Sequence, residues 1–439
     1  MGYYFEDIYY NKFVTHPKML GDKPKLNITK SEEEYARGQR VIPGGLCGFK
    51  APYAFIPGEY PIYIERGNGS HMWDPDGNEF IDYMGAYGPI GIGFNEAEIN
   101  EPVFEQICQG FSFDLYSTIV NEAAERFVAL VPGAEQVYFA KTGTDVVNMA
   151  IKLARAYTHK EYILTDGYHG WGDYTQYRGD AGLPSEIVKG TIKIAYGDID
   201  HYAEEIKKGN VAGVLVNPAY HESCVPVHFD QQFLNEIRRL TIEYDIPLIF
   251  DEVRTGFRVT MPGVQKLAAV EADISVYGKA IANGYAISAV AGKAKYMEPI
   301  KYGAPKGVIV NSTCFSNTSD LRALIETIKF YEKHNVIQSL WEKGEYFLSE
   351  LDKLIQLHDI PFYGGDIPVM PSLDFDRKIL GEEKFAQCQL TLYTYLIRSG
   401  MFCSPSDHFS MMYRHTKRDI DLLLDAIDRG FSVVKKECL

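Results

Sequence analysis

Three polar segments of this 439-residue sequence have residue types and spacing that could carry out group-transfer chemistry. The first, Lys141-Thr142-Gly143-Thr144, lies between an apolar run and a helix-like stretch. A glycine and two hydroxyls at a helix start can present backbone N–H groups and side chains to a phosphate. The same residues are also typical of a helix cap with a tight turn. The pattern leaves both a phosphate site and a structural cap open.

The second segment places Asp251 at the end of an apolar run, directly before Glu252-Val253-Arg254. A carboxylate at the end of a buried strand needs a partner, because an uncompensated buried charge is costly. That partner could be a nearby arginine, a helix cap or the protonated nitrogen of a bound ring.

The third segment contains Lys279, which follows Gly278 and precedes a run of mostly small and apolar residues. A buried lysine has a lowered pKa, and its neutral amine is the nucleophile that forms Schiff bases. The structural alternative is a lysine whose aliphatic stem is covered while its charged end reaches solvent.

An alternation of strands and helices is expected to position these segments. From about Val120, apolar runs alternate with amphipathic stretches, which favours a largely parallel sheet covered by helices. Ligands of such sheets bind at the carboxyl ends of the strands. The expected strands are 137–139, 162–164, 211–217 and 247–250, and the expected helices are 31–41, 145–156, 233–244, 321–333, 336–357 and 417–436. A β-meander is expected over 60–83, and a strand-like stretch before the last helix.

The composition disfavours several classes of function. The net charge of -15 and the pI near 5.3 disfavour binding to nucleic acid or to an anionic membrane. The seven cysteines are scattered and form no CxxC pair, so neither a disulfide framework nor a metal site is expected. With no secretory signal and no apolar stretch of about 20 residues, a cytoplasmic protein is expected.

The three segments occur in an order that resembles the class III aminotransferases of fold type I, which use pyridoxal 5'-phosphate. Within that family the sequence is most similar to glutamate-1-semialdehyde aminomutases. The resemblance extends from about Ser31 to Phe431. It rests on the motifs Val41-Ile42-Pro43-Gly44-Gly45, Trp73-Asp74-Pro75-Asp76-Gly77-Asn78-Glu79, Tyr168-His169-Gly170-Trp171, Asp251-Glu252-Val253 with Thr255-Gly256-Phe257-Arg258, and Gly278-Lys279.

The resemblance implies an α/β fold of the type I transferases. A large domain would contain a mainly parallel seven-stranded sheet, and the N- and C-terminal segments would form a smaller α+β domain. The expected boundaries are 1–75 for an N-terminal segment with an arm, a helix and a β-meander, 76–325 for the cofactor-binding domain, and 326–439 for the C-terminal small domain.

The resemblance also implies roles for individual residues. Lys279 would hold the cofactor as a Schiff base and move a proton between substrate and cofactor carbons. Asp251 would keep the pyridine nitrogen protonated, so that the ring acts as an electron sink. Val253 and Tyr168 would contact the two faces of the ring. His169 lies in no cluster with metal-ligand spacing, so it is interpreted as a structural or ring-orienting residue.

The phosphate site is expected from Gly143 and Thr144, with Thr142 beside them. Thr313 matches the threonine that reaches the phosphate of the neighbouring subunit, which implies a homodimer with shared active sites. Glu222 lies where the family has a Glu or Asn near the phenolic oxygen of the cofactor.

The sequence departs from the aminomutase pattern at the substrate pocket. After Pro-Gly-Gly it reads Leu46-Cys47-Gly48-Phe49-Lys50-Ala51, where the aminomutase has a serine and an arginine for the substrate carboxylate. The other departures are Tyr87 for a tryptophan, Asn217-Pro218 for Glu-Pro, and Lys141 for an asparagine. The inference is pyridoxal phosphate chemistry on a different substrate. Candidates for binding a substrate anion are Lys50, Arg254 and Arg414, although ordinary ion pairing explains each of them too.

The favoured function is an aminotransferase that moves an amino group from a small-molecule donor to a carbonyl acceptor in two half-reactions. The acceptor could be a sugar, a keto acid or a biosynthetic intermediate. The alternative is an intramolecular aminomutase or an amino-acid epimerase, which needs no separate donor. A decarboxylase would release carbon dioxide, and a catalytically silent scaffold protein would purify without the cofactor.

Overall fold

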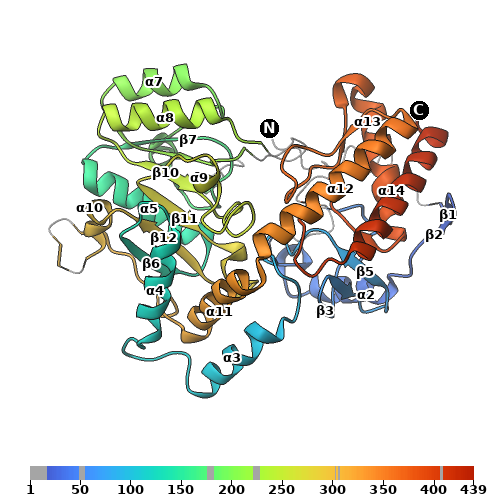
Figure 1. Ribbon diagram of the computed structural model, residues 1–439, viewed down its shortest axis with the longest axis horizontal. Coiled ribbons are helices and arrows are strands. Elements are labelled where there is room, and N and C mark those ends of the chain that lie inside the picture. The colour runs from blue at the N-terminus through green and yellow to red at the C-terminus, as the bar shows by residue number, and fades with distance from the viewer. Residues whose placement is uncertain are drawn as a thin grey trace. The chain divides into compact units, whose positions relative to one another are not determined.

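The computed structural model describes residues 17–48, 55–175, 182–220, 228–301, 303–304, 307–405 and 409–439 (Figure 1). The chain forms two compact units. We call one the sheet unit, which comprises the described residues of 97–220 and 228–337, and the other the terminal unit, which comprises the described residues of 17–96 and 338–439.

The sheet unit contains a seven-stranded sheet in the order β6-β12-β11-β10-β9-β7-β8. The strands are β6 (Gln136–Ala140), β7 (Tyr162–Thr165), β8 (Thr191–Lys193), β9 (Val211–Val216), β10 (Leu248–Asp251), β11 (Ile274–Tyr277) and β12 (Ser288–Gly292). Only β12 runs antiparallel to its neighbours. The predicted α/β fold with a mainly parallel seven-stranded sheet is therefore confirmed.

The central strands β9, β10, β11 and β12 are buried along their whole length. Their near-continuous apolar sequences are typical of strands covered on both faces. The connections β6–α5–β7 and β9–α8–β10 cross the sheet in opposite directions, so right-handed crossovers place α5 (Gly143–Thr158) and α8 (Gln231–Glu243) on opposite faces. Figure 1 shows α5 and α8 on either side of β10.

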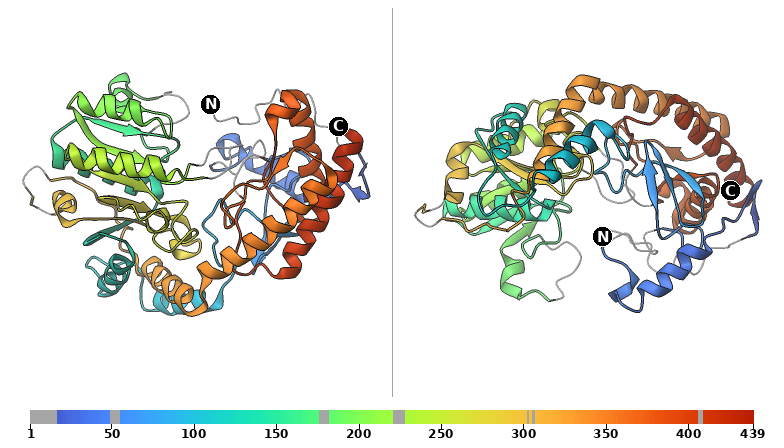
Figure 2. Two further views of the ribbon diagram at one scale, coloured as in Figure 1. Left: turned by 45° about the horizontal axis from the view of Figure 1, so that its top comes forward. Right: turned by 90° about the horizontal axis from the view of Figure 1, so that it is seen from below.

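Three helices pack together at the β6 edge. α11 (Thr318–His334) contacts both α3 (Ala97–Cys108) and α4 (Ile119–Leu130), and Figure 2 shows α3 beside α11. The unit's other helices are α6 (Ser185–Lys189), α7 (Ile199–Lys207), α9 (Val264–Leu267), η3 (Lys279–Ala282), α10 (Ala294–Met297) and η4 (Glu298–Ile300).

The terminal unit contains a four-stranded sheet in the order β15-β5-β4-β3. The antiparallel strands β3 (Arg66–Asn68), β4 (His71–Trp73) and β5 (Glu79–Asp82) form the predicted meander, and β15 (Met401–Phe402) pairs parallel with β5. The remaining strands are β1 (Met19–Leu20), β2 (Lys23–Pro24), β13 (Phe362–Tyr363) and β14 (Asp374–Phe375).

Four longer helices complete the description: α2 (Thr29–Gly38), α12 (Val336–His358), most of which belongs to the terminal unit, α13 (Arg377–Arg398) and α14 (Lys417–Glu437). A short turn, η1 (Pro43–Gly45), follows α2. The sequence analysis did not predict α13. Within the described ranges, we find no helix with the length and apolar character needed to cross a membrane.

Arg398 and Glu59 form a fully buried ion pair in the terminal unit. Nε and Nη2 of Arg398 donate to the two carboxylate oxygens at 2.7 Å each. Removing one member of a buried pair leaves an uncompensated charge, so Arg398→Met is expected to lower the free energy of unfolding by about 3–5 kcal/mol. Chemical denaturation measures this. Arg37→Met, which breaks the exposed pair with Glu34, should cost less than about 1 kcal/mol.

Candidate active site

The three segments singled out in the sequence follow strands that end at one edge of the main sheet. β10 ends at Asp251, and its parallel neighbour β11 ends two residues before Lys279. β6, which precedes the turn Thr142–Thr144, runs parallel to β11 because β12 is antiparallel to both. Carboxyl ends of parallel strands meet at the same edge, where α/β proteins bind ligands.

The side chain of Val253 is the point where the three segments meet. Its backbone N–H donates to Asp251 Oδ1 at 3.0 Å. A Cβ added to Gly143 would lie 3.1 Å from Val253 Cγ1, and one added to Gly278 would lie 3.4 Å from the same atom. The phosphate-turn candidate, the Asp251 loop and the segment before Lys279 are thus in van der Waals contact.

Lys279 has a strained backbone. Its φ of 49° lies in the left-handed region, which costs a residue with a Cβ roughly 1–2 kcal/mol. The side chain is half-buried, and the three residues that follow are buried. Strain of this kind persists only where surrounding structure enforces it, and it gathers at functional sites.

A buried chain of charged groups lies behind Asp251. His169 Nδ1 is 2.8 Å from Asp251 Oδ2, and His169 Nε2 is 3.0 Å from Asp166 Oδ1. Burial alone would lower the pKa of His169, but hydrogen bonds with Asp166 and then Asp251 raise it to about 9. His169 is therefore an imidazolium that donates to both carboxylates. Asn217 donates its backbone N–H to Asp166 Oδ1 at 3.0 Å.

The turn before α5 forms a helix cap and leaves backbone donors at the start of the helix. Thr142 Oγ1 accepts from the N–H of Asp145 at 3.1 Å, and Asp145 Oδ2 accepts from the N–H of Thr142 at 2.8 Å. Thr142 is therefore the N-cap residue of α5, as the structural alternative in the sequence analysis predicted. Gly143 and Thr144 are the first two residues of α5, so their N–H groups have no carbonyl of the helix to donate to. These N–H groups lie at the positive end of the helix dipole, which favours an anion.

The segment after β7 lies against this turn. Gly170 has a φ of 88°, and a Cβ there would come within 2.5 Å of Thr144 Oγ1, so only glycine fits. Trp171 donates its backbone N–H to the same oxygen at 3.4 Å. Burial, and then the nearby charge of Asp251, raise the pKa of the Tyr168 hydroxyl. Tyr168 therefore lies near Asp251, while Gly170 and Trp171 contact the turn.

The other residues that the sequence analysis proposed for binding the cofactor or a substrate anion lie in different parts of the chain. Thr313 is exposed in the segment before α11, and Arg254 is buried. Arg414 belongs to the terminal unit, where its Nη2 lies 2.6 Å from Glu96 Oε2. Glu222 and Lys50 lie outside the described residues.

Two features of this site were not predicted: the contact of Asp166 with His169, and the contact of Asn217 with Asp166. Asp166 directly follows β7, as Asp251 ends β10. The rule that singled out Asp251, a carboxylate at the end of an apolar strand, could also have found Asp166.

These residues fit the chemical groups of pyridoxal 5'-phosphate. The start of α5 offers donors to a phosphate, Asp251 offers a carboxylate to a protonated ring nitrogen, and Lys279 offers an amine to the aldehyde. The methyl groups of Val253 and the aromatic ring of Tyr168 suit apolar contact with the two faces of a planar ring. Groups of three or more His, Cys, Asp or Glu side chains that could hold a metal ion were not found within the described ranges.

A model of the family "Aminotransferase class-III" matches residues 55–365. This chain belongs to that family. A 3-aminobutyryl-CoA aminotransferase from Cloacimonas acidaminovorans is 37% identical over 94% of this chain and 99% of its own. A glutamate-1-semialdehyde 2,1-aminomutase from Methanothrix thermoacetophila is 30% identical over 91% of this chain and 96% of its own.

Solved structures share the fold of this chain. The FumI protein of Sphingopyxis sp. MTA144, in its pyridoxal phosphate internal aldimine form, superposes with a TM-score of 0.86 at 28% identity, over 93% of this chain and 97% of its own. An omega-transaminase from Sphaerobacter thermophilus, at 24% identity and a TM-score of 0.85, shares the fold over 92% and 98% of the two chains. This class III aminotransferase is an enzyme that depends on pyridoxal 5'-phosphate.

The contact between Asp166 and His169 predicts how the free energy of unfolding depends on pH. The pKa of His169 is raised in the folded state, so its contribution to stability is fully present below the unfolded pKa of about 6.5 and is lost as pH rises through about 9. Asp166→Asn should therefore shrink the loss of unfolding free energy between pH 6 and pH 9.5. Glu79→Gln, beside the half-buried His71, is the matched control and should leave that loss unchanged. An identical pH dependence in Asp166→Asn would contradict the charge assignment.

Proposed function

We propose that this class III aminotransferase acts on an acyl compound whose carboxylate is masked as a thioester, of the 3-aminobutyryl-CoA type. The relative that carries this activity in its name is similar over nearly its entire length, at 37% identity. The observation that carries the proposal is the sequence Leu46-Cys47-Gly48, which has no arginine where the aminomutase pattern has one for the substrate carboxylate.

Two paired arginines of the terminal unit are consistent with a substrate that has no free carboxylate. A carboxylate that is bound away from water needs a cationic partner. Arg398 is paired with Glu59, and Arg414 is paired with Glu96, so both guanidinium groups already serve protein carboxylates. A thioester carries no charge and therefore needs no such partner.

We assign the catalytic work to the residues gathered at the sheet edge. Lys279 holds the cofactor and moves the proton at the reacting carbon, as its strained, half-buried position favours. Asp251, held by His169, keeps the ring nitrogen protonated, and Val253 and Tyr168 orient the ring. The bound cofactor supplies the electron sink.

The start of α5 binds the phosphate through the donors of three residues, namely Thr142, Gly143 and Thr144. In the family pattern Thr313 completes this site from a neighbouring subunit, and Glu222 lies beside the phenolic oxygen; we propose both roles here. The large part of the chain predicted as 76–325 is the cofactor-binding domain in this proposal.

We further propose a cytoplasmic homodimer. Large apolar side chains are exposed along α3 and the segment that follows it: Phe104, Ile107, Phe111, Phe113, Leu115 and Tyr116. Exposed apolar side chains gathered on one segment are typical of protein interfaces. The six cysteines of the described ranges are free thiols, which suits a reducing compartment. Sedimentation at micromolar concentration tests the dimer, and a monomer with full activity would contradict it.

An intramolecular aminomutase is the second candidate, favoured by the relative of that name at 30% identity over most of both chains. The two functions differ in one requirement. An aminotransferase needs a separate amino acceptor to complete its cycle, whereas an aminomutase returns the amino group to its own substrate.

The absorption spectrum of the holoenzyme tests the proposal. Adding 3-aminobutyryl-CoA should bleach the cofactor band with stoichiometric oxo product, and adding 2-oxoglutarate or pyruvate should restore the band. Free 3-aminobutyrate is the matched control and should react at least about tenfold more slowly, which corresponds to about 1.4 kcal/mol. Equal rates for the free acid and the thioester would contradict the proposal that the carboxylate of the substrate is masked. Turnover without any acceptor would favour the aminomutase.

A further inference from the structure

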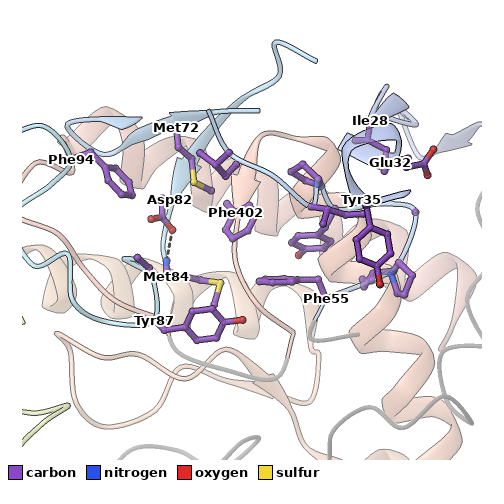
Figure 3. A pocket seen from close by; sticks show the side chains of 18 residues that line it. Ile28, Glu32, Tyr35, Phe55, Met72, Asp82, Met84, Tyr87, Phe94 and Phe402 are labelled. Carbon is purple, nitrogen blue, oxygen red and sulfur yellow. Dashed lines mark hydrogen bonds between the residues drawn. The ribbon is translucent and has the colours of Figure 1, made fainter. Parts of the chain in front are cut away.

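A cavity and a buried polar cluster lie outside the residues assigned to the site. The cavity, of about 430 Å³, lies wholly within the terminal unit, and Figure 3 shows Phe55, Met72 and Phe402 on its wall. A wall of mainly apolar side chains suits a hydrocarbon but offers little that could hold a reacting group in place. The polar cluster surrounds Glu252 and belongs to the sheet unit, which also contains Lys279.

The carboxyl group of Glu252 is fully buried and is surrounded by hydrogen-bond donors. The hydroxyl of Thr255 donates to its Oε2, as does the N–H of Val264 at 2.9 Å, and the N–H of Gln265 donates to its Oε1 at 2.9 Å. Burial raises the pKa of Glu252 to about 7, while these hydrogen bonds act in the opposite direction. Three donors around one carboxyl group fit its ionised form, which accepts hydrogen bonds and cannot donate them.

These hydrogen bonds close the loop that follows β10. Residues 252–263 form this loop, which contains Val253 and leads to α9. The carboxylate of Glu252 holds the far end of the loop at the start of α9, and the carbonyl of Glu252 accepts the N–H of Gly256 at 2.8 Å. Gly263 has a φ of 88°, and a Cβ there would overlap Glu252 Oε2, so only glycine fits. One residue therefore holds the loop in several places.

Glu252 also connects the carboxyl ends of β10 and β11. Asp251 and Val276 are register partners in the two strands, and the N–H of Glu252 donates to the carbonyl of Val276 at 2.9 Å. Lys279 follows Val276 by three residues. The residue that closes the loop thus also fixes the end of the strand that leads to Lys279.

Tyr277, the last residue of β11, makes a second connection between the loop and the segment of Lys279. Its buried hydroxyl accepts from Gln265 Nε2 at 2.5 Å and donates to the carbonyl of Pro262 at 3.1 Å. A Cβ added to Gly256 would lie 2.8 Å from Tyr277 Cδ1, so the ring packs against the backbone of the loop. A shift of the loop would therefore also disturb the segment that leads to Lys279.

We propose that Glu252 is a positioning residue for amino transfer, which holds the loop after β10 at a fixed place relative to Lys279. This role rests on the proposed function, in which Asp251 and Val253 meet the cofactor. The connection itself rests on the hydrogen bonds of Glu252 and Tyr277. Because a misplacement of about 1 Å can lower a rate by about 10²-fold, such a residue affects the reaction without contacting the reacting atoms.

The matched control is Asp273, a buried carboxylate that joins the same two strands at their amino ends. Its Oδ2 accepts the N–H of Leu248 at 3.0 Å, and its own N–H donates to the carbonyl of Leu248 at 2.9 Å. Arg238 and Lys293 pair with it at 2.6 and 2.7 Å. Asp273→Asn therefore removes a buried charge from the same strands as Glu252→Gln, but at the edge opposite the proposed site.

Hydrogen exchange of the holoenzyme, followed by mass spectrometry, tests the connection without turnover. Glu252→Gln keeps the size of the side chain but replaces one acceptor oxygen by an NH₂ group that faces donors. We expect amide exchange in residues 252–265 to become at least about tenfold faster, as in a locally opened segment. Residues 211–216 of β9 should exchange as before, and Asp273→Asn should leave exchange in 252–265 unchanged. Unchanged exchange of 252–265 in Glu252→Gln would overturn the proposal.

The kinetics of bleaching test the effect on the reaction. In Glu252→Gln the rate constant at saturating amine should fall by about 10–100-fold, because the reacting groups are misplaced. The amine concentration that gives half of the maximum rate should stay within about twofold, because no binding group is removed. Asp273→Asn should lower the free energy of unfolding but keep the rate constant within about twofold. An equal fall of the rate constant in both variants would show a general loss of stability and would overturn the positioning role.

A milder variant decides the question if Glu252→Gln does not fold. Thr255→Val keeps the shape of the side chain and removes one donor from Glu252, so exchange of 252–265 should rise and the rate constant should fall about threefold. An unchanged rate constant and unchanged exchange in Thr255→Val would then overturn the proposal. If no amine bleaches the unaltered enzyme, the proposed function is refuted, whereas hydrogen exchange still decides whether Glu252 holds the loop.

Discussion

Replacement of Lys279 by alanine is expected to lower the rate constant of the amino-transfer half-reaction by about 10⁴-fold, the upper range for a positioned proton-transfer group. Lys279 begins η3, just after the carboxyl end of β11 and at the sheet edge where Asp251 also lies. Its φ of 49° lies in the left-handed region. No other residue assigned to the site carries an amine. Both covalent attachment of the cofactor and movement of the proton are therefore lost together.

The measurement has two parts, because lost activity alone could reflect a damaged fold. Stopped-flow absorbance gives the rate constant of bleaching. Borohydride reduction followed by peptide mass spectrometry shows which lysine carries the cofactor, and the label should appear at Lys279 and be absent from Lys279→Ala. Lys266→Ala, at an exposed position, is the control and should keep both activity and label. A label on another lysine would contradict the assignment.

The residue pattern predicted four of the seven strands of the main sheet, namely β6, β7, β9 and β10, because their signals are local, and it did not identify β8, β11 or β12. Strands β9 and β10 are short apolar runs, and α5 and α8 have clear helical periodicity. The sheet edge that unites Asp251 and Lys279 follows from that alternation and from general rules for parallel sheets. These features depend on residues close together in the chain, which a single sequence displays.

Helix α13 shows where this reasoning fails. Its second half reads Leu-Thr-Leu-Tyr-Thr-Tyr-Leu-Ile, an alternation of β-branched, aromatic and apolar residues that is typical of a strand. Nearly every residue from Phe385 to Arg398 is buried, so tertiary packing against α14 overrides the local preference. A helix that is covered on most sides has no amphipathic period to detect.

The charged chain behind Asp251 was not predictable for a different reason. Asp166 follows β7, Asp251 ends β10, and Asn217 follows β9, so their contacts exist only once the strands are ordered in the sheet. The sequence showed Asn217 only as a departure from Glu-Pro. In the structure this asparagine supports Asp166, which supplies the carboxylate beside His169 Nε2.

Replacement of Asp251 by asparagine is expected to lower the same rate constant by about 10²–10³-fold, as removal of one preorganised electrostatic group typically does. The amide keeps the size of the side chain but removes the negative charge that would hold a ring nitrogen protonated. His169 also loses one of the two carboxylates that raise its pKa to about 9, so that pKa should fall toward its ordinary value. Both effects weaken the electron sink that the protein maintains.

The two consequences can be measured separately. Stopped-flow absorbance gives the rate, and an NMR titration of the His169 ring gives its pKa without any turnover. Asp200→Asn, on the first turn of α7, is the matched charge-removing control and should change neither quantity. Because His169 Nε2 keeps its contact with Asp166, the ring should stay oriented in Asp251→Asn, and the fold should survive. A variant with a lowered His169 pKa but an unchanged rate would show that Asp251 serves His169 alone, and that another group meets the cofactor nitrogen.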